Sequence, residues 1–380
     1  MNNSNLNQIF THYIDKFEYV NNGEHMEYYK WQVCHEYPIL MKKALSADKE
    51  NFADSLKDVK KCTYNIIDSY TQPFGGLVEI ARHDPDAVRI VFKDLYAEDG
   101  NDIKIRMEKI NDFFNHCNDL LNKYYPDSFL YKQNSHSVSS YLFLNDPDNH
   151  YMYKAVQSQR FADCVEFYDD WGSGDCIKLD VYHRMCDELV AAIKDCAELI
   201  NTDQSRFDGR LRIDGELHPD RQKHILAFDL IYCCSTYDLY DGISYTKRNM
   251  KEKQLYLAEK AKAQQLLEEY EKAKSDYILL DEAVQCFIDM VCKGDKVIHK
   301  KYGEGCLESI DDKYISATYE CGEVAVSLPL TIANDIIRLD KPDFNEKVGK
   351  YRAILKRYNN IPNALDYAAR ALKPYEEYIE

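Results

Sequence analysis

Long apolar runs are absent from this chain of 380 residues. The longest, such as the VAVSLPL segment that Ser327 interrupts, cover only a few residues, whereas a membrane-spanning helix needs about 20. The first ten residues, MNNSNLNQIF, also lack the basic start and apolar stretch of a signal peptide. We therefore expect a cytoplasmic protein that makes no contact with a membrane.

Paired cysteine motifs are also absent, although the chain has 13 cysteines. None of them forms a C-x-x-C pair, and the nearest grouping of possible ligands, His218, His224, Cys233 and Cys234, has no spacing that is common in zinc sites. Reduced cysteine packs like a small apolar side chain in cytosolic proteins. We therefore expect core thiols, and neither a metal ion nor another cofactor.

Basic residues are in the minority, with 48 Lys and Arg against 65 Asp and Glu, so the net charge is −17. An acidic field opposes contact with phosphates and disfavours nucleic-acid binding. A local basic patch could still provide such contacts. In that alternative the candidate nucleic-acid-binding residues are Lys132, His136, Lys154 and Arg160, several of which have tyrosine neighbours in the sequence.

No catalytic motif stands out, and we expect no enzyme. The chain has no G-x-x-x-x-G-K-[S/T] phosphate loop, and the WGSGD segment at 171–175 lacks the lysine and the following helix. Asp229 lies in the nearly apolar stretch 224–240, which predicts a buried helix. A buried carboxylate needs a partner, so we interpret Asp229 as bonded to a nearby Arg or backbone amide. The alternative is an acid in a hydrolase pocket together with His218 or His224.

Amphipathic patterns dominate the first two thirds of the chain. Residues 1–66 predict a helical N-terminal subdomain with apolar side chains three and four positions apart. Residues 67–245 predict a helix-rich mixed α/β recognition region, with strand-like runs at 128–132 (SFLYK) and 137–144 (SVSSYLFL). Within that region, Pro85 is expected at the first position of a helix.

Residues 246–292 predict one long charged helix with a coiled-coil seam. Its apolar positions step by four and three residues, and they include Leu266, Tyr270, Tyr277, Leu280, Val284 and Phe287. A helix of about 40 residues would span about 60 Å, so its stripe must pair with another helix. That helix could belong to the same chain or to a second copy, and we favour a homodimer.

A compact β pattern follows this helix. Residues 293–340 predict a five-stranded small barrel of SH3-like or Tudor-like type, because short β-rich runs are separated by YGEG, DDK and CGE. Residues 341–380 predict two further helices, divided near Asn359 to Pro362. The fold class is therefore mainly α with small β elements, that is, α+β.

The predicted barrel resembles the Tudor-like C-terminal module of the UvrD/PcrA helicase group. The resemblance covers about 45 residues and is carried by Gly294-Asp295, Val297, His299, Lys301, the Tyr302-Gly303-Glu304-Gly305 turn, Tyr319 and Gly322-Glu323. In those helicases the module is an interaction element that docks on RNA polymerase. The resemblance implies a protein-binding module here, with His299, Lys300, Lys301, Tyr302, Glu304 and Tyr319 as the partner-binding residues.

A second segment is similar to the N-terminal regions of McrB-like restriction and defence ATPases. The matching positions are Asp84-Pro85-Asp86, Arg106, Ser139-Ser140, Asp146-Pro147, Tyr151, Tyr153 and Lys154. Such regions often recognise nucleic acid. The chain departs from that family because it has no ATPase motor.

These patterns lead to one main hypothesis and one alternative. The main hypothesis is a non-enzymatic bacterial adaptor that binds a protein partner through the barrel and the coiled coil, in anti-phage defence or DNA metabolism. The alternative is a nucleic-acid recognition subunit of a restriction or defence system.

Overall fold

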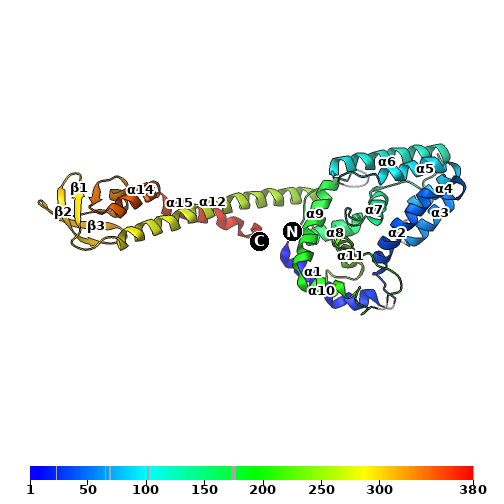
Figure 1. Cartoon of the computed structure of the whole chain (residues 1–380), viewed down its shortest axis with the longest axis horizontal. Helices are drawn as coiled ribbons and strands as arrows, with labels where there is room; N and C mark the ends of the chain where they lie inside the picture. The colour runs from blue at the N-terminus through cyan, green and yellow to red at the C-terminus, as the bar shows by residue number, and fades with distance from the viewer. Residues whose placement is uncertain are drawn as a thin grey trace. The chain divides into compact units, whose positions relative to one another are not determined.

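The computed structural model describes residues 1–22, 24–64, 66–67, 70–100, 102–172, 177–211 and 213–379. This part of the chain is mainly helical, and its strands form one small antiparallel sheet near the C-terminus (Figure 1). The predicted class, mainly α with a small β element, is confirmed. The chain divides into two compact units, unit 1 at Met1–Lys253 and unit 2 at Gln254–Glu380.

Unit 1 is built from helices. They are α1 (Asn3–Asn21), α2 (Tyr29–Ser46), α3 (Lys49–Cys62), α4 (Pro73–His83), α5 (Pro85–Leu95), α6 (Ile103–Tyr124), α7 (Ser135–Asn145), α8 (Ala155–Cys164), α9 (Leu179–Asp195), α10 (Ala197–Gln204) and α11 (His224–Thr236). Pro85 is the first residue of α5, as predicted, and the Asp84 side chain caps that helix by accepting from the Ala87 amide.

The strands predicted at 128–132 and 137–144 are wrong. Residues 128–132 form no strand, and the second run lies in α7. A capping box fixes the start of α7, because the Asn134 side chain accepts from the Ser137 amide while the Ser137 hydroxyl accepts from the Asn134 amide. Nearly every α7 side chain is buried, so its short apolar run had no helical period to distinguish it from a strand.

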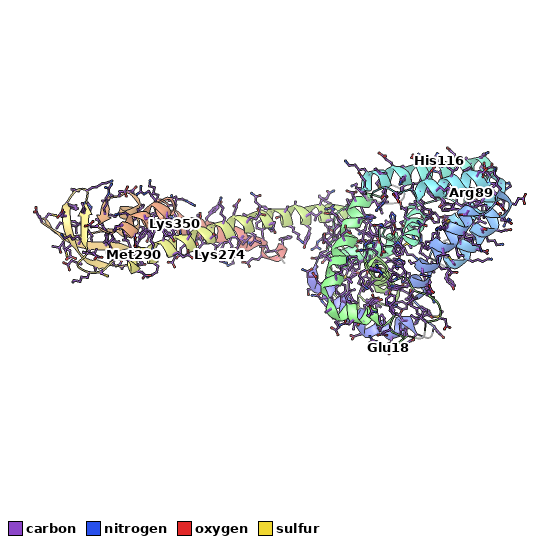
Figure 2. The ribbon with its side chains drawn as sticks, viewed as in Figure 1. Glu18, Arg89, His116, Lys274, Met290 and Lys350 are labelled. Carbon is purple, nitrogen blue, oxygen red and sulfur yellow. The ribbon has the colours of Figure 1, made fainter. Side chains whose placement is uncertain are left out.

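One continuous core runs through unit 1. It contains Trp31 and Tyr37 of α2, Phe92 of α5 and Tyr141 of α7, all fully buried. Glu18 and His116 are exposed and mark the outside of this unit (Figure 2). The core crosses the expected boundary between residues 66 and 67, so the two N-terminal regions that the sequence separates share one packed interior.

Unit 2 combines the sheet with helices. Its elements are most of α12 (Met250–Asp289), then β1 (Lys296–His299), β2 (Gly303–Ile310), β3 (Tyr314–Tyr319), β4 (Gly322–Ser327), α13 (Leu328–Ala333), β5 (Ile337–Leu339), α14 (Pro342–Lys356), α15 (Ile361–Leu372) and the 3-10 helix η1 (Lys373–Tyr378). The strand order is β4-β3-β2-β1-β5 with antiparallel pairs throughout. No pairing among the described residues joins β4 to β5, so closure into a barrel is not shown.

The apolar stripe of α12 is covered by two different neighbours. Leu280, Val284 and Phe287 are buried in the core that α12 shares with the sheet and α14. Nearer the start of α12, the chain's own C-terminal segment lies alongside, with the Tyr256 and Tyr378 ring centroids 5.4 Å apart (Figure 1). The predicted boundary at residue 293 therefore divides a single core.

The middle of α12 is less covered by other side chains than its C-terminal end is. Leu266 and Tyr270 are partly exposed, and Tyr277 is 42% exposed. Arg357 donates a hydrogen bond to Asp276 at 2.6 Å, which ties the segment after α14 to α12. Intrachain packing thus accounts for much of the stripe. A coiled coil between two chains is not shown, and the homodimer stays a prediction.

Candidate binding sites

Three of the six predicted partner-binding residues form an aromatic cluster in unit 2. The His299 ring centroid lies 4.5 Å from that of Tyr302 and 5.7 Å from that of Tyr319, and the two tyrosine rings are 5.6 Å apart. The β1–β2 hairpin brings His299 and Tyr302 together, since His299 pairs with Gly303 at its closing end, and β3 beside β2 adds Tyr319. Gly303 has a φ of +78°, a backbone conformation that favours glycine at this turn.

The six predicted partner-binding residues differ in their exposure to solvent. His299 is 6% and Tyr319 5% exposed, so both act chiefly in packing. The His299 Nδ1 accepts from the Lys301 and Tyr302 amides at 3.0 and 3.3 Å, which leaves the ring proton on Nε2. Burial, and then the Lys301 charge, lower the pKa of His299. The neutral ring therefore holds the turn in place.

The remaining predicted residues lie on the outside of the turn. Lys300, Lys301 and Glu304 are exposed. The Lys301 ammonium lies 5.1 Å from the Tyr302 ring centroid, and Lys300 donates to the Asn334 carbonyl at 3.0 Å. These contacts fix the direction of both cations beside the sheet.

A groove of about 530 Å³ crosses the outer face of the sheet. We call it the sheet groove and define it by Lys296, Ile298, Glu304, Cys306 and Thr318. The register explains why they share a face, because Lys296 pairs with Cys306, Ile298 with Glu304, and Cys306 with Thr318. Ile298 is 48% exposed. The groove thus exposes an apolar side chain among polar ones.

The four predicted nucleic-acid contacts have different surroundings. Lys132 is exposed, whereas the Arg160 guanidinium lies 4.5 Å from the Tyr240 ring centroid. The His136 ring nitrogens lie 2.8 Å from the Tyr153 carbonyl and 3.0 Å from the Ile66 carbonyl, which is a structural role. Burial lowers the pKa of His136, and the Lys154 charge lowers it further, so these two side chains are neighbours.

Lys154 lies in a pocket of about 350 Å³ that sequence reasoning did not find. We call it the tyrosine pocket, and its aromatic lining consists of Tyr28, Tyr29, Tyr64, Tyr232 and Tyr237. The tyrosines come from the α2 entry, the end of α3 and α11, so only the fold brings them together. Because the chain has 31 tyrosines, the positions of these five in the sequence do not distinguish them from the others.

Asp229 has the partners that its burial requires. Its carboxylate pairs with Lys30, lies 3.3 Å from Arg206 Nη2 and accepts from the Tyr13 hydroxyl at 2.5 Å. Burial acts to raise the pKa of Asp229, but the Lys30 and Arg206 charges bring it below its usual value. The prediction of a bonded Asp with an Arg partner is confirmed.

The alternative acid cluster is not assembled. His224 lies 3.1 Å from the His150 carbonyl, and His218 accepts from the Asp220 amide at 3.1 Å. Within the described residues neither histidine bonds to Asp229. The prediction of a hydrolase pocket around Asp229 with these histidines is therefore unsupported by the geometry.

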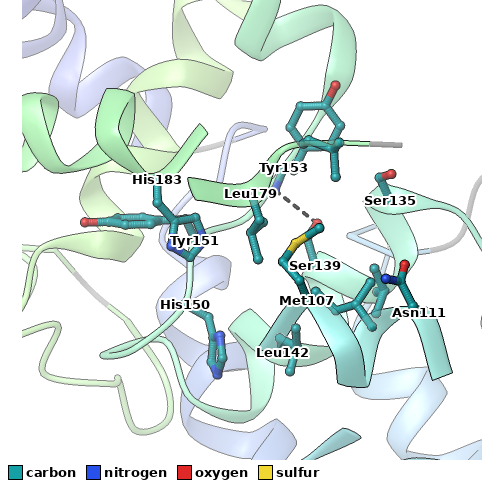
Figure 3. A pocket seen from close by; sticks show the side chains of 13 residues that line it. Met107, Asn111, Ser135, Ser139, Leu142, His150, Tyr151, Tyr153, Leu179 and His183 are labelled. Atoms are coloured by element: carbon teal, nitrogen blue, oxygen red, sulfur yellow. Dashed lines mark hydrogen bonds between the residues drawn. The ribbon is translucent and has the colours of Figure 1, made fainter. Parts of the chain in front are cut away.

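A small cavity between α6, α7 and α9 contains two further histidines, His150 and His183 (Figure 3). Its free volume is about 20 Å³, which holds about one water molecule. Tyr151 lies against His183 with ring centroids 5.1 Å apart, and the Tyr153 amide donates to the Ser139 hydroxyl at 3.2 Å (Figure 3). This cavity is too small for an organic substrate.

The described residues contain no group of three His, Cys, Asp or Glu side chains placed to hold a metal ion. In the same part of the chain, every helix is too short or too polar to cross a bilayer. The twelve described cysteines are free, and most of them are buried, whereas Cys292, Cys306 and Cys321 of unit 2 are exposed.

Comparison with known proteins adds no relative, since no family model, curated protein or solved structure matches this chain.

Proposed function

We propose that this chain is a non-enzymatic adaptor that binds a macromolecular partner, a protein, on the sheet of unit 2. The observation that carries the proposal is the sheet groove, a concave surface where Ile298 is exposed among polar side chains. Protein interfaces commonly combine an apolar centre with a polar rim. Lys301 and Glu304 beside the groove would orient a partner of mixed charge.

The aromatic cluster beneath this surface supports the proposal. His299, Tyr302 and Tyr319 pack against one another, so the β1–β2 hairpin presents a preformed face. A preformed face loses less conformational entropy on binding than a flexible one. The resemblance to Tudor-like helicase modules points to the same role. We further propose that the adaptor acts in anti-phage defence or DNA metabolism.

The test is a pair of matched substitutions in the full chain. Ile298→Glu places a charge in the groove, whereas Ile278→Glu places one on α12, where Ile278 is 50% exposed. Cross-linking followed by mass spectrometry should find a protein that the wild type and Ile278→Glu capture and Ile298→Glu does not. Equal capture by all three chains would reject the groove as the binding element.

Point substitutions are preferable to truncation at residue 292. The α12 residues Leu280, Val284 and Phe287 are buried in one core with the sheet and α14, so removing residues after 292 would expose them. Loss of capture by such a fragment could then reflect unfolding or aggregation rather than a missing interface.

A second candidate function is nucleic-acid recognition by unit 1. The observation that favours it is Lys154 in the tyrosine pocket, because a cation beside aromatic rings is how many proteins contact single strands. A gel-shift series over salt tests it, since phosphate-driven binding should weaken steeply as salt rises. No shift at low salt would reject this function.

A further inference from the structure

We propose that the tyrosine pocket binds a nucleotide, with the phosphate on Lys154 and the base against the tyrosine rings. The inference concerns the same pocket as the second candidate function, but it requires neither partner capture nor strand recognition, since a pocket can bind a free nucleotide. It depends on a cation without an ion pair, on exposed aromatic faces and on the size of the pocket.

The ion pairs of the neighbouring core leave Lys154 as a cation without a partner. In that core three cationic side chains pair with three anionic ones: Lys30, Arg206 and Lys223 with Glu27, Asp203 and Asp229. Lys154 is half-buried and has no ion pair or side-chain hydrogen bond within the described residues. A partly desolvated cation without a counter-ion attracts an anion.

Two carboxylates, Glu24 and Glu27, also line the pocket, and neither forms an ion pair with Lys154 within the described residues. Glu27 lies 2.8 Å from Lys30 and also accepts from the Tyr237 hydroxyl, whereas Glu24 is exposed to solvent. Burial, followed by the Lys30 charge, lowers the pKa of Lys154 to about 8. The ammonium form still predominates at pH 7, and its positive charge remains available to a phosphate.

The aromatic faces lie next to this charge. The Lys154 ammonium is 5.2 Å and the Lys30 ammonium 4.1 Å from the centroid of the Tyr232 ring. Tyr29 and Tyr64 meet edge to face with centroids 5.9 Å apart. Tyr64 is exposed and has a φ of +46°, which bulky residues rarely adopt. Rings that remain partly open to solvent can accept a stacked base.

Size and chemistry together select the ligand class. A volume of about 350 Å³ is within the range of small-molecule sites. A simple inorganic anion would use Lys154 and leave the tyrosine lining without a function, whereas an uncharged aromatic molecule would leave Lys154 unpaired. A nucleotide carries both the phosphate and the flat base that this lining can accommodate.

Calorimetry with the full chain tests the assignment. Adenosine monophosphate should bind saturably, and adenosine and inorganic phosphate more weakly. Lys154→Met should weaken binding by about tenfold or more, because a hydrogen bond to a charged group is lost. Lys57→Met removes the same charge from an exposed position of α3 outside the pocket lining and should leave binding unchanged. Lys154→Arg should retain most of the binding and show that the site still folds.

Two further comparisons complete the test. Affinity should fall as the pH rises through about 8, the pKa of Lys154, because the neutral amine no longer attracts the phosphate. A 5′-phosphorylated trinucleotide that binds more tightly than adenosine monophosphate would identify a strand end as the source, and the reverse would identify the free nucleotide. No saturable binding of either, equal binding of inorganic phosphate, or no effect of Lys154→Met would overturn the proposal.

Discussion

The ring of Tyr319 packs directly on the backbone of Gly305. A Cβ at Gly305 would lie only 2.5 Å from Tyr319 Cδ1 and 2.8 Å from the Thr318 carbonyl oxygen. This contact locks the β2–β3 pair beneath the aromatic cluster and so sets the shape of the surface to which we assign partner binding.

Gly305→Ala should therefore destabilise unit 2. A methyl group inserted into a packed site of this kind costs about 1–3 kcal/mol, which a urea denaturation curve of the full chain can resolve. Gly349→Ala is the matched control, because a Cβ at Gly349 meets no atom within 4 Å and the residue lies inside α14. That control should leave unit 2 equally stable or slightly more stable. Equal effects of both substitutions would show that the Tyr319 contact is unimportant.

Breaking the buried ion pair between Lys30 and Asp229 should strongly destabilise unit 1. Lys30→Met leaves the Asp229 carboxylate buried with one cation fewer, and losing one partner of a buried pair costs about 3–5 kcal/mol. Thermal unfolding followed by circular dichroism provides the measurement. Lys61→Met, which removes an exposed pair with Asp58, should leave the unfolding midpoint unchanged. A small decrease in the unfolding midpoint of Lys30→Met would mean that Arg206 and Tyr13 alone can stabilise the buried Asp229 carboxylate.

Acid should destabilise unit 1 through two partly buried histidines, His150 and His183. Burial, with the Arg106 charge as the next cause, lowers the pKa of His150 and of His183 to about 3. When pH falls below about 6.5, the unfolded chain takes up protons first, so the free energy of unfolding decreases from there towards pH 3. Above about pH 6.5 the contribution of these two histidines is complete.

A comparison of pH profiles isolates this effect. Asp220 acts in the opposite direction, because burial and then Asp203 raise its pKa to about 6. The double variant His150→Gln with His183→Gln should show a shallower loss of stability between pH 6.5 and 4 than the wild type does. An exposed control, His116→Gln, should keep the wild-type slope. If the double variant also keeps that slope, these histidines do not cause it.

Removing the C-terminal segment should expose the start of the α12 stripe. Tyr256 and Lys262 contact Tyr378 and Tyr375 of η1, so a chain ending at residue 362 loses that cover. We expect stronger self-association of the shortened chain than of the full chain in sedimentation equilibrium. Tyr367→Ser, at an exposed position of α15, should not change the association state. An unchanged state of the shortened chain would contradict the covering role.

The sequence predicted the features that depend on local pattern. The long helix α12, the five strands of the sheet and the two C-terminal helices follow from periodicity and turn residues. The 137–144 run was predicted wrongly because α7 is buried on nearly all sides and shows no period. The stripe of Leu280, Val284 and Phe287 predicts a helix partner, yet both the sheet and α14 contribute to the core that covers it, because periodicity shows which face is apolar and not what packs on it.

Some site residues are close in the sequence, and others are brought together only by the fold. His299, Tyr302 and Tyr319 come from one hairpin and the neighbouring strand, so a short-range motif could place them together. Lys154, Tyr29 and Tyr232 line one pocket only because α2, α8 and α11 pack together. Contacts of this long range leave no spacing in a single sequence.

Partner binding on the sheet groove is tested by the affinity of a captured partner for three purified full-length chains. We expect Ile298→Glu to weaken binding by tenfold or more, about 1.4 kcal/mol, while Ile278→Glu binds like the wild type. Unchanged affinity of Ile298→Glu would contradict partner binding on the sheet groove, and so would an equal loss in Ile278→Glu.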